Sequence, residues 1–293
     1  MTNTGSGKIQ YKKSSQVREI WRRFKKNKTA MLGLYILSIT VLVAIFADLI
    51  VPYQKAVLQV GRERLQLPSA AHWFGTDGFG RDVFARVVHG SRYSLLIGVS
   101  TSLIALVLGG LLGAAAGYYG GRADNFIMRI MDVFMCIPPI LLALAIVAAL
   151  GPSLQNLLIA ITISAMPDKT RLIRSTILTV AEQDFVEAAH SYGAKDLRII
   201  IKYILPNAIG PVIVSTTMGI ASMILSAAGL SYLGMGVQPP APEWGAMLSE
   251  ARQYMRQAAY LLYFPGIAIL LSALSFNLVG DGLRDALDPK LRD

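Results

Sequence analysis

Long apolar runs, separated by shorter polar stretches, set the pattern of this chain. A helix needs about 20 apolar residues to cross the hydrocarbon core of a bilayer. Five runs meet or approach that length, at residues 30–51, 94–117, 133–150, 208–230 and 260–279. A sixth run, residues 153–166, is shorter and taken alone could be a buried or re-entrant segment. The pattern predicts an all-α polytopic membrane protein.

The placement of basic residues decides between five and six spans. Nine Lys and Arg residues precede residue 30, and short flanks rich in these residues stay in the cytoplasm. With six spans, 20 Lys and Arg residues lie inside and 8 outside, whereas five spans give 13 inside and 15 outside. We therefore expect six transmembrane helices, with residues 153–166 as the fourth and with both termini in the cytoplasm.

The composition agrees with a bilayer as the solvent. Only 16% of the residues are charged, and the mean hydropathy is +0.49. A soluble domain is typically about 25% charged. The net charge of +10 is explained by the basic N-terminal flank as an orientation signal, which argues against a nucleic-acid surface. Cys136 is the one cysteine, so neither an internal disulfide nor a cysteine metal site is expected.

The six spans predict an order of segments along the chain. Residues 75–77 (Gly-Thr-Asp) have the composition of a turn and helix N-cap, and residues 83–88 have the spacing of an interfacial amphipathic helix. We expect a cytoplasmic basic tail at 1–29, a first transmembrane helix at 30–51, an extracytoplasmic loop with the interfacial helix at 52–93, a transmembrane core at 94–281 that includes a second extracytoplasmic loop at 231–259, and a cytoplasmic tail at 282–293.

Glycine and proline mark two positions inside the spans. Gly109, Gly113 and Gly117 recur every four residues, a spacing that lets two helix backbones approach closely in lipid. Pro138 and Pro139 lie within the third apolar run, where they remove backbone donors and bend or break the helix. Such a break is either the start of the helix or the lining of a pathway.

A charged connector at residues 168–206 lies between the fourth and fifth runs. A charge at the bilayer centre costs at least about 2.5 kcal/mol, so this segment is expected in water or against protein. Gly193 allows a bend between two short helices, and the small side chains of Ala188 and Ala189 leave room for a partner to close over them. Four apolar residues have the spacing of one helical stripe: Leu197, Ile200, Ile201 and Ile204.

The connector resembles the EAA loop of ABC importer permeases. The resemblance rests on Glu-Ala-Ala, a glycine after three intervening residues, and Leu-Pro after eleven more. Tyr203 stands where the common pattern has isoleucine or histidine. The matching residues, which the resemblance assigns to coupling with an ATPase, are Glu187, Ala188, Ala189, Gly193, Leu205 and Pro206.

Other segments resemble the C-type subunits of the dipeptide/oligopeptide/nickel permeases. They run from about residue 31 to residue 289 and include the ending at residues 276–289. Ala85 stands where that family usually has serine. The extracytoplasmic residues that carry the resemblance are Gly75, Thr76, Asp77, Gly80, Arg81, Asp82, Glu243, Trp244 and Gly245.

The resemblance implies a type I ABC importer fold in a bacterial or archaeal cytoplasmic membrane. The chain would form half of a pathway for di- or oligopeptides, with nickel or a metal chelate as the alternative cargo. Implied partners are a homologous B-type permease, two cytoplasmic ATPases that bind ATP and Mg, and an extracytoplasmic substrate-binding protein. No cofactor, metal or catalytic residue is expected in this chain.

Polar residues of the last two spans are candidates for the pathway. A rival hypothesis, an ion-coupled secondary transporter or a channel, is disfavoured at this stage because the span interiors are almost free of charge. A scaffold without a transport role is a second rival. The candidate pathway residues are Ser215, Thr216, Thr217, Ser222 and Asn277.

Overall fold

Helices alone form the regular structure of residues 16–288, the part of the chain that this computed structural model describes. A helix satisfies its backbone hydrogen bonds within its own segment, which a lipid environment requires. The single β-type contact in this range is an isolated bridge between Thr76 and Asp82. The predicted all-α class is confirmed.

Four stretches are long and apolar enough to cross a bilayer, and they match the predicted runs at residues 30–51, 94–117, 208–230 and 260–279. They are α2 (Lys28–Ile45), α5 (Val83–Tyr119), the stretch Asp196–Tyr232 that ends in α11 (Leu205–Tyr232), and α13 (Tyr260–Leu287).

The third predicted span is a broken helix. It consists of α6 (Gly121–Met135) and α7 (Pro139–Leu150), which pass the test for one span together but meet at 84°. The break lies at Cys136–Pro138, because Pro138 cannot donate a backbone hydrogen bond. The predicted break at the two prolines is confirmed.

The short fourth run belongs to a longer helix. Ser153 caps α8 (Leu154–Ala181), which has 28 residues and is about 42 Å long at 1.5 Å per residue. Its second half is polar, so α8 is not among the apolar spans, which number four in residues 16–288, or five with the bent pair. The predicted number of six is not reached by length and composition.

The α5–α8 contact is the glycine seam, formed by Gly109, Gly113 and Gly117. A Cβ atom at Gly113 would lie 2.5 Å from the carbonyl oxygen of Thr170, and one at Gly117 would lie 2.9 Å from that of Arg174. Such distances leave no room for a side chain. The predicted role of the three glycines in helix packing is confirmed.

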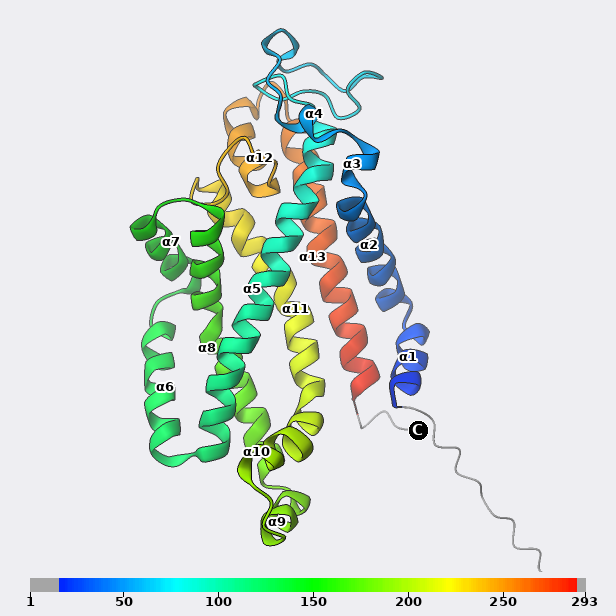
Figure 1. Ribbon diagram of the computed structural model, residues 1–293. Coiled ribbons are helices and arrows are strands. Elements are labelled where there is room, and N and C mark those ends of the chain that lie inside the picture. The colour runs from blue at the N-terminus through cyan, green and yellow to red at the C-terminus, as the bar shows by residue number, and fades with distance from the viewer. Residues whose placement is uncertain (1–15, 289–293) are drawn as a thin grey trace, which may run out of the picture.

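Short helices gather at the two ends of the bundle (Figure 1). At one end lie α3 (Ala47–Ile50), α4 (Tyr53–Val57), η1 (Gly61–Glu63), α12 (Trp244–Ala251) and η3 (Arg252–Tyr254). At the opposite end lie α9 (Asp184–Ser191), α10 (Asp196–Ile199), η2 (Ile200–Ile204), α1 (Gln16–Lys26) and the last turns of α13.

Two predicted segments at these ends are continuous with long helices. Residues 83–88, predicted as an interfacial helix leading into the second span, are the first turns of α5, because Asp82 caps that helix, and Ala85 and Val88 are buried against α3 and α4. The predicted tail 282–293 is helical as far as Leu287, since α1 and α2 pack on the end of α13. Residues 1–15 and 289–293 lie outside the described range.

Candidate functional site

A cavity of about 460 Å³ opens between α7, α8, α11 and α13. Its apolar wall comes from residues such as Ile140, Met218 and Leu230. Its polar lining consists of Ser164, Asp168, Lys169, Ser215, Ser222, Ser226 and Asn277.

Three of the five predicted pathway residues share this cavity, namely Ser215, Ser222 and Asn277. Thr216 lies elsewhere, because it is buried at the contact with α5, where its carbonyl oxygen accepts a hydrogen bond from Ser102. Thr217 is partly exposed on α11 and donates to the carbonyl of Ile213, and it does not line the cavity either.

Sequence analysis missed the charged residues of the cavity. It assigned Asp168 and Lys169 to the connector and described the span interiors as almost free of charge, but both residues lie near the middle of α8. Lys169 is 6% exposed, and its Nζ donates to the carbonyl oxygen and Oγ of Ser215 at 2.8 and 3.1 Å. The signal was the length of the run 153–166, since a helix that begins there and spans the bundle must include residue 169.

The C-terminal half of α8 is joined to α6 by ion pairs. Arg171 contacts Asp132 at 2.5 Å, and Arg174 donates two hydrogen bonds to Asp124. These contacts join α6, the first part of the broken span, to the helix that carries Lys169.

Beyond Ala181 the chain turns through the elbow, defined here as α9, α10 and the turn between them. Gly193 has φ of +74°, a left-handed conformation that favours glycine. The predicted pair of short helices with a bend at this glycine is confirmed. The elbow rests on α8 through an apolar cluster of Ile173, Ile177, Val186, Ala189, Ile199 and Ile204.

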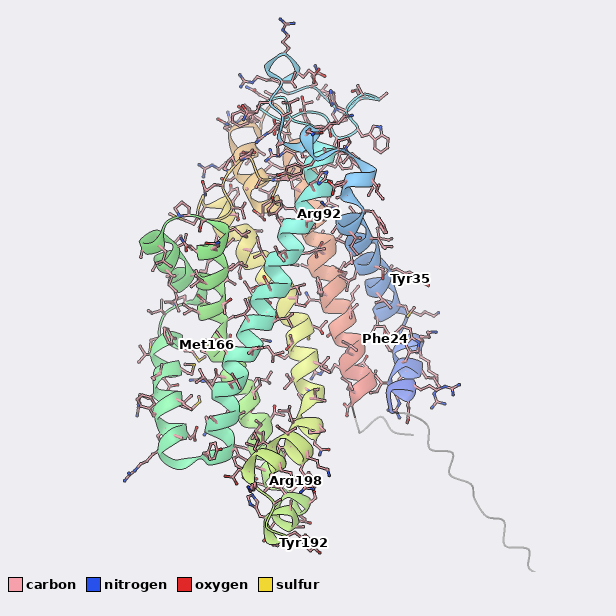
Figure 2. All side chains as sticks on the ribbon, in the orientation of Figure 1. Phe24, Tyr35, Arg92, Met166, Tyr192 and Arg198 are labelled. Carbon is pink, nitrogen blue, oxygen red and sulfur yellow. The ribbon has the colours of Figure 1, made fainter. Side chains whose placement is uncertain are left out.

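The elbow presents some predicted coupling residues and buries others. Glu187 and Ala188 are exposed, but Ala189 is 7% exposed and faces α8, so it cannot contribute its small size to an outer surface. Leu205 and Pro206 are exposed where α11 begins. Figure 2 shows Tyr192, which is 92% exposed, and Arg198 at this tip of the molecule.

The predicted apolar stripe has a different register. Ile199 and Ile204 are buried, whereas Leu197 and Ile201 are 69% and 57% exposed. The cause is the π-helix η2, whose wider turn rotates the side chains relative to an α-helix. Leu197 and Ile201 therefore lie on the exposed face of the elbow and of η2, respectively.

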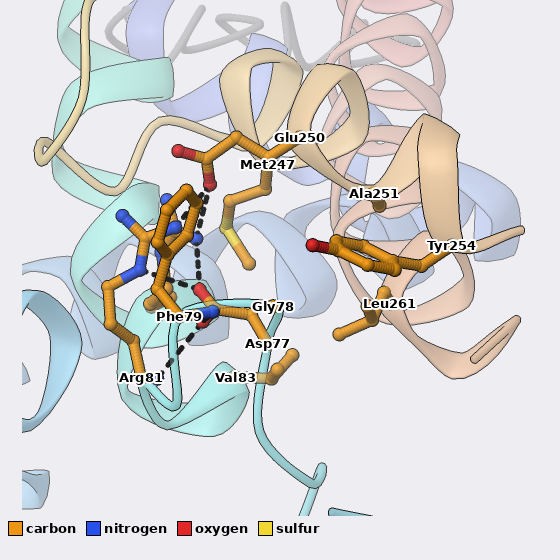
Figure 3. A pocket seen from close by; sticks show the side chains of 11 residues that line it. Asp77, Gly78, Phe79, Arg81, Val83, Met247, Glu250, Ala251, Tyr254 and Leu261 are labelled. Atoms are coloured by element: carbon orange, nitrogen blue, oxygen red, sulfur yellow. Dashed lines mark hydrogen bonds and ion pairs between the residues drawn. The ribbon is translucent and has the colours of Figure 1, made fainter. Parts of the chain in front are cut away.

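At the other end of the bundle, two of the predicted extracytoplasmic residues, Asp77 and Arg81, form a buried ion-pair cluster with two residues that were not predicted, Arg86 and Glu250 (Figure 3). Asp77 accepts from Nε of Arg81 at 2.7 Å and from Nη1 of Arg86 at 2.6 Å. Glu250 of α12 accepts from both arginines at 2.6 Å. The cluster fastens the first outer loop to α5 and α12.

The remaining outer motif residues shape the backbone around this cluster. Asp82 accepts a hydrogen bond from the Ala85 N–H and contacts Nδ1 of His72 at 2.8 Å. Gly80 has φ of +79°. Gly75 (φ +76°) and Thr76 form the predicted turn, in which the Thr76 hydroxyl accepts from the Gln66 N–H.

Glu243, Trp244 and Gly245 join α12 to the bundle. Glu243 caps α12 by accepting from the N–H groups of Gly245 and Ala246 at 2.9 and 2.8 Å. Burial raises the pKa of this carboxyl group, and these two hydrogen bonds offset only part of the effect. Trp244 donates its indole N–H to the carbonyl of Val87 at 3.0 Å. Gly245 lies against α11, where a Cβ would be 2.6 Å from the Ala228 backbone.

Two family models match this chain. Residues 109–293 match the binding-protein-dependent transport system inner membrane component. Residues 15–68 match the N-terminal TM domain of oligopeptide transport permease C.

Relatives resemble the chain over nearly its whole length. The dipeptide transport system permease protein DppC of Alkalihalophilus pseudofirmus is 50% identical over 97% of this chain and 93% of its own. The di/tripeptide permease protein DppC of Pseudomonas aeruginosa is 46% identical over 95% and 94%. The glutathione transport system permease protein GsiD of Pectobacterium atrosepticum is 45% identical over 94% and 91%.

Solved structures share the fold at low sequence identity. The inward-facing MetNI methionine ABC transporter aligns with a TM-score of 0.58 at 19% identity, over 70% of this chain and 97% of that one. An amino acid ABC transporter aligns with a TM-score of 0.52 at 16% identity, over 71% and 95%. The described helices therefore adopt a type I importer permease fold.

Proposed function

This chain belongs to the inner membrane components of binding-protein-dependent transport systems, a family of ABC importer permeases, and we propose that di- and oligopeptides are its cargo. The chain is a transport subunit rather than an enzyme. It would form half of the pathway in a prokaryotic cytoplasmic membrane, and a homologous B-type permease would supply the other half.

The names of the relatives support the peptide proposal over nickel or a metal chelate. They are named for dipeptides, for di- and tripeptides, and for glutathione, which is itself a tripeptide. The proposed cargo is therefore a short zwitterionic chain, delivered from outside by a separate binding protein.

The proposed engine is a pair of cytoplasmic ATPase subunits that bind ATP and Mg. Their contact would be the elbow, with Glu187, Ala188 and Gly193 as the exposed part and Leu205 and Pro206 beside it. The outer docking site would include the loop around α12. Both assignments place the two kinds of partner at opposite ends of the bundle.

One observation carries the coupling proposal: the elbow connects α8 to α11, two of the four helices that line the cavity. Its apolar cluster joins it to α8, and η2 continues directly into α11. Movement of the elbow would therefore act on these two helices. Packed interfaces of this kind tend to switch between discrete arrangements.

An ion-coupled transporter is the rival from another class. The earlier objection, that the spans lack charge, is weakened by Asp168 and Lys169 in the cavity. Membership of the importer permease family is now the stronger objection to this rival. The two proposals differ in the energy source, because only an ABC importer stops when ATP hydrolysis is blocked.

Reconstitution of the complete transporter tests the function and the elbow together. We expect ATP-dependent uptake of a labelled dipeptide into proteoliposomes, and its loss in Glu187→Lys and Gly193→Asp, because the first reverses an exposed charge and the second strains a left-handed backbone. Matched controls are Glu63→Lys and Gly61→Asp, the same changes on the first outer loop, where a Cβ at Gly61 meets no atom within 4 Å. Normal uptake by both elbow variants would exclude the elbow as the coupling site, and uptake without ATP would exclude the importer mechanism.

A further inference from the structure

Lys169 has unusual surroundings for a basic residue inside a helical bundle. It is 94% buried, and the hydrogen bonds from its Nζ go to two oxygens of a single residue, Ser215. An ammonium group has three N–H donors. One donor is therefore left without a protein acceptor among residues 16–288.

The charge of Lys169 also lacks a carboxylate partner in the described part of the chain. No Asp or Glu oxygen within residues 16–288 lies within 4.0 Å of its Nζ. Arg171 and Arg174, two and five residues further along the same helix, are each paired with an aspartate of α6. Buried charges are normally paired, because removing an ion from water is costly. Lys169 is thus a buried basic residue of α8 without a direct ion-pair partner among the described residues, although Asp168 lines the same cavity.

The neighbouring helices leave space for this side chain. A Cβ at Gly219 of α11 would lie 3.0 Å from the Lys169 Nζ, and a Cβ at Gly109 of α5 would lie 2.9 Å from the Lys169 Cβ. Glycines at both positions let the side chain pass between the helices. The ammonium group reaches the wall of the cavity as a result.

The cavity has the size and chemistry of a site for a small zwitterion. Its volume of about 460 Å³ is within the range of about 300–1,000 Å³ that is typical of ligand pockets. Lys169 and Asp168 give its lining one charge of each sign. Ser222 and Asn277 add neutral hydrogen-bonding groups, and the rest of the wall is largely apolar.

We propose that the ammonium group of Lys169 binds the terminal carboxylate of the peptide as it passes through this cavity. The carboxylate would accept a hydrogen bond from the remaining N–H of Nζ and would be the ion-pair partner that Lys169 lacks. Asp168 lines the same cavity and would favour the peptide's ammonium end. This proposal rests on peptide import as the function, and it assigns specificity to the permease in addition to the binding protein.

The test uses the complete transporter with its binding protein in proteoliposomes and a labelled dipeptide with free termini. Lys169→Met keeps an unbranched side chain that is one atom shorter and removes the charge, and we expect uptake to fall by about tenfold or more, the typical effect of losing a charged hydrogen bond. ATP hydrolysis stimulated by the liganded binding protein should change less than about twofold, because neither end of the bundle is altered. Lys169→Arg should retain most of the uptake. Ser100→Ala, on α5 and outside the cavity, is the neutral control and should change uptake by less than about threefold, because its hydroxyl donates to carbonyl oxygens of its own helix.

Lys169→Gln provides a second uncharged variant if the Met variant does not assemble. Wild-type uptake rates in either uncharged variant would overturn the proposal. A loss of assembly in both uncharged variants, or a loss of stimulated ATP hydrolysis in parallel with uptake, would also overturn it, since Lys169 would then act as a structural link or pair with the second permease. If the wild-type transporter carries no dipeptide at all, peptide import itself fails, a result that differs from a defect confined to the variants.

Discussion

A single buried carboxylate shows how one residue supports the outer end of the molecule. Glu243 is 1% exposed and caps α12, which in turn supplies Glu250 to the ion-pair cluster. Its hydrogen bonds favour the ionised form, and its burial favours the neutral form. The raised pKa indicates that burial is the larger effect.

The sign of this shift leads to a pH prediction. A carboxyl group with a raised pKa in the folded state binds its proton more tightly than in the unfolded state, so its ionisation lowers stability as pH rises above the ordinary value of 4.5. Glu243→Gln cannot ionise, so we expect the Tm of the wild type relative to this variant to decrease from about pH 4.5 upward. Thermal unfolding of the purified transporter at several pH values measures the difference.

The control for this measurement is Gln183→Ala, which changes an exposed side chain near the elbow and removes no ionisable group. Its difference from the wild type should stay constant across the pH range. A wild-type Tm that rises with pH relative to Glu243→Gln would show that the hydrogen bonds outweigh burial.

Residue-level prediction succeeded where a local motif determines the structure. The turn around Gly75 and the bend at Gly193 could be predicted because few residues other than glycine adopt a positive φ. The burial of Ala189 and Lys169 could not, because each depends on where α8 lies relative to another segment. The cap at Asp82 was missed for a similar reason, since its helix begins closer to the loop than the apolar run indicates.

At the scale of elements, the close packing of α5 on α8 is the contact that fixes the position of α8. The two helices touch backbone to backbone along the glycine seam, which small residues allow in lipid. The contact holds α8 in the position that places Lys169 between α5 and α11.

Two nearby glycines of α5, one inside the seam and one beside it, provide a matched test of the seam. Gly113→Ala would bring a Cβ to 2.5 Å from the Thr170 carbonyl oxygen, so the helices must separate. Gly110→Ala would meet only the flexible end of Ile173 at 3.3 Å. We expect Gly113→Ala to lower the Tm of the transporter clearly more than Gly110→Ala, because overpacking costs about 1–3 kcal/mol of folding free energy. Equal effects of the two variants would contradict this packing.

Element boundaries were predictable only where the apolar pattern ends sharply. The start of α8 and the break before α7 follow from Ser153 and the two prolines. The end of α8 was missed because its polar half is sheltered by α5 and α6, and such shelter leaves no mark in hydropathy. The register of the elbow stripe was missed because η2 is a π-helix, for which the sequence has no established signature.

At the scale of the whole molecule, the elbow and both described chain ends lie at one end of the bundle and the outer cluster at the other (Figure 1). This arrangement agrees with the prediction from charge that the N-terminal flank, the connector and the C-terminal region share one side. The side itself, cytoplasmic or external, remains the prediction from the distribution of Lys and Arg.

Labelling of intact cells tests that orientation. In a chain with Cys136 replaced by serine, a single cysteine at Lys195 should react with a membrane-impermeant maleimide only after the cells are opened, because the elbow is expected inside. A single cysteine at Arg62, in the outer loop, should react in intact cells. Both residues are exposed, so access to the reagent depends on the side of the membrane. The reverse pattern would invert the proposed topology.

The seam between α5 and α8 runs from the cavity toward the elbow, because Gly109 lies against Lys169 and Gly117 lies against Arg174 and Ile177. The two backbones touch along this length, so this part of α8 cannot shift without α5. A displacement of the elbow, which packs on Ile173 and Ile177, would therefore reach the cavity wall through two helices that move as one body. The three glycines would then set how faithfully that displacement is passed on.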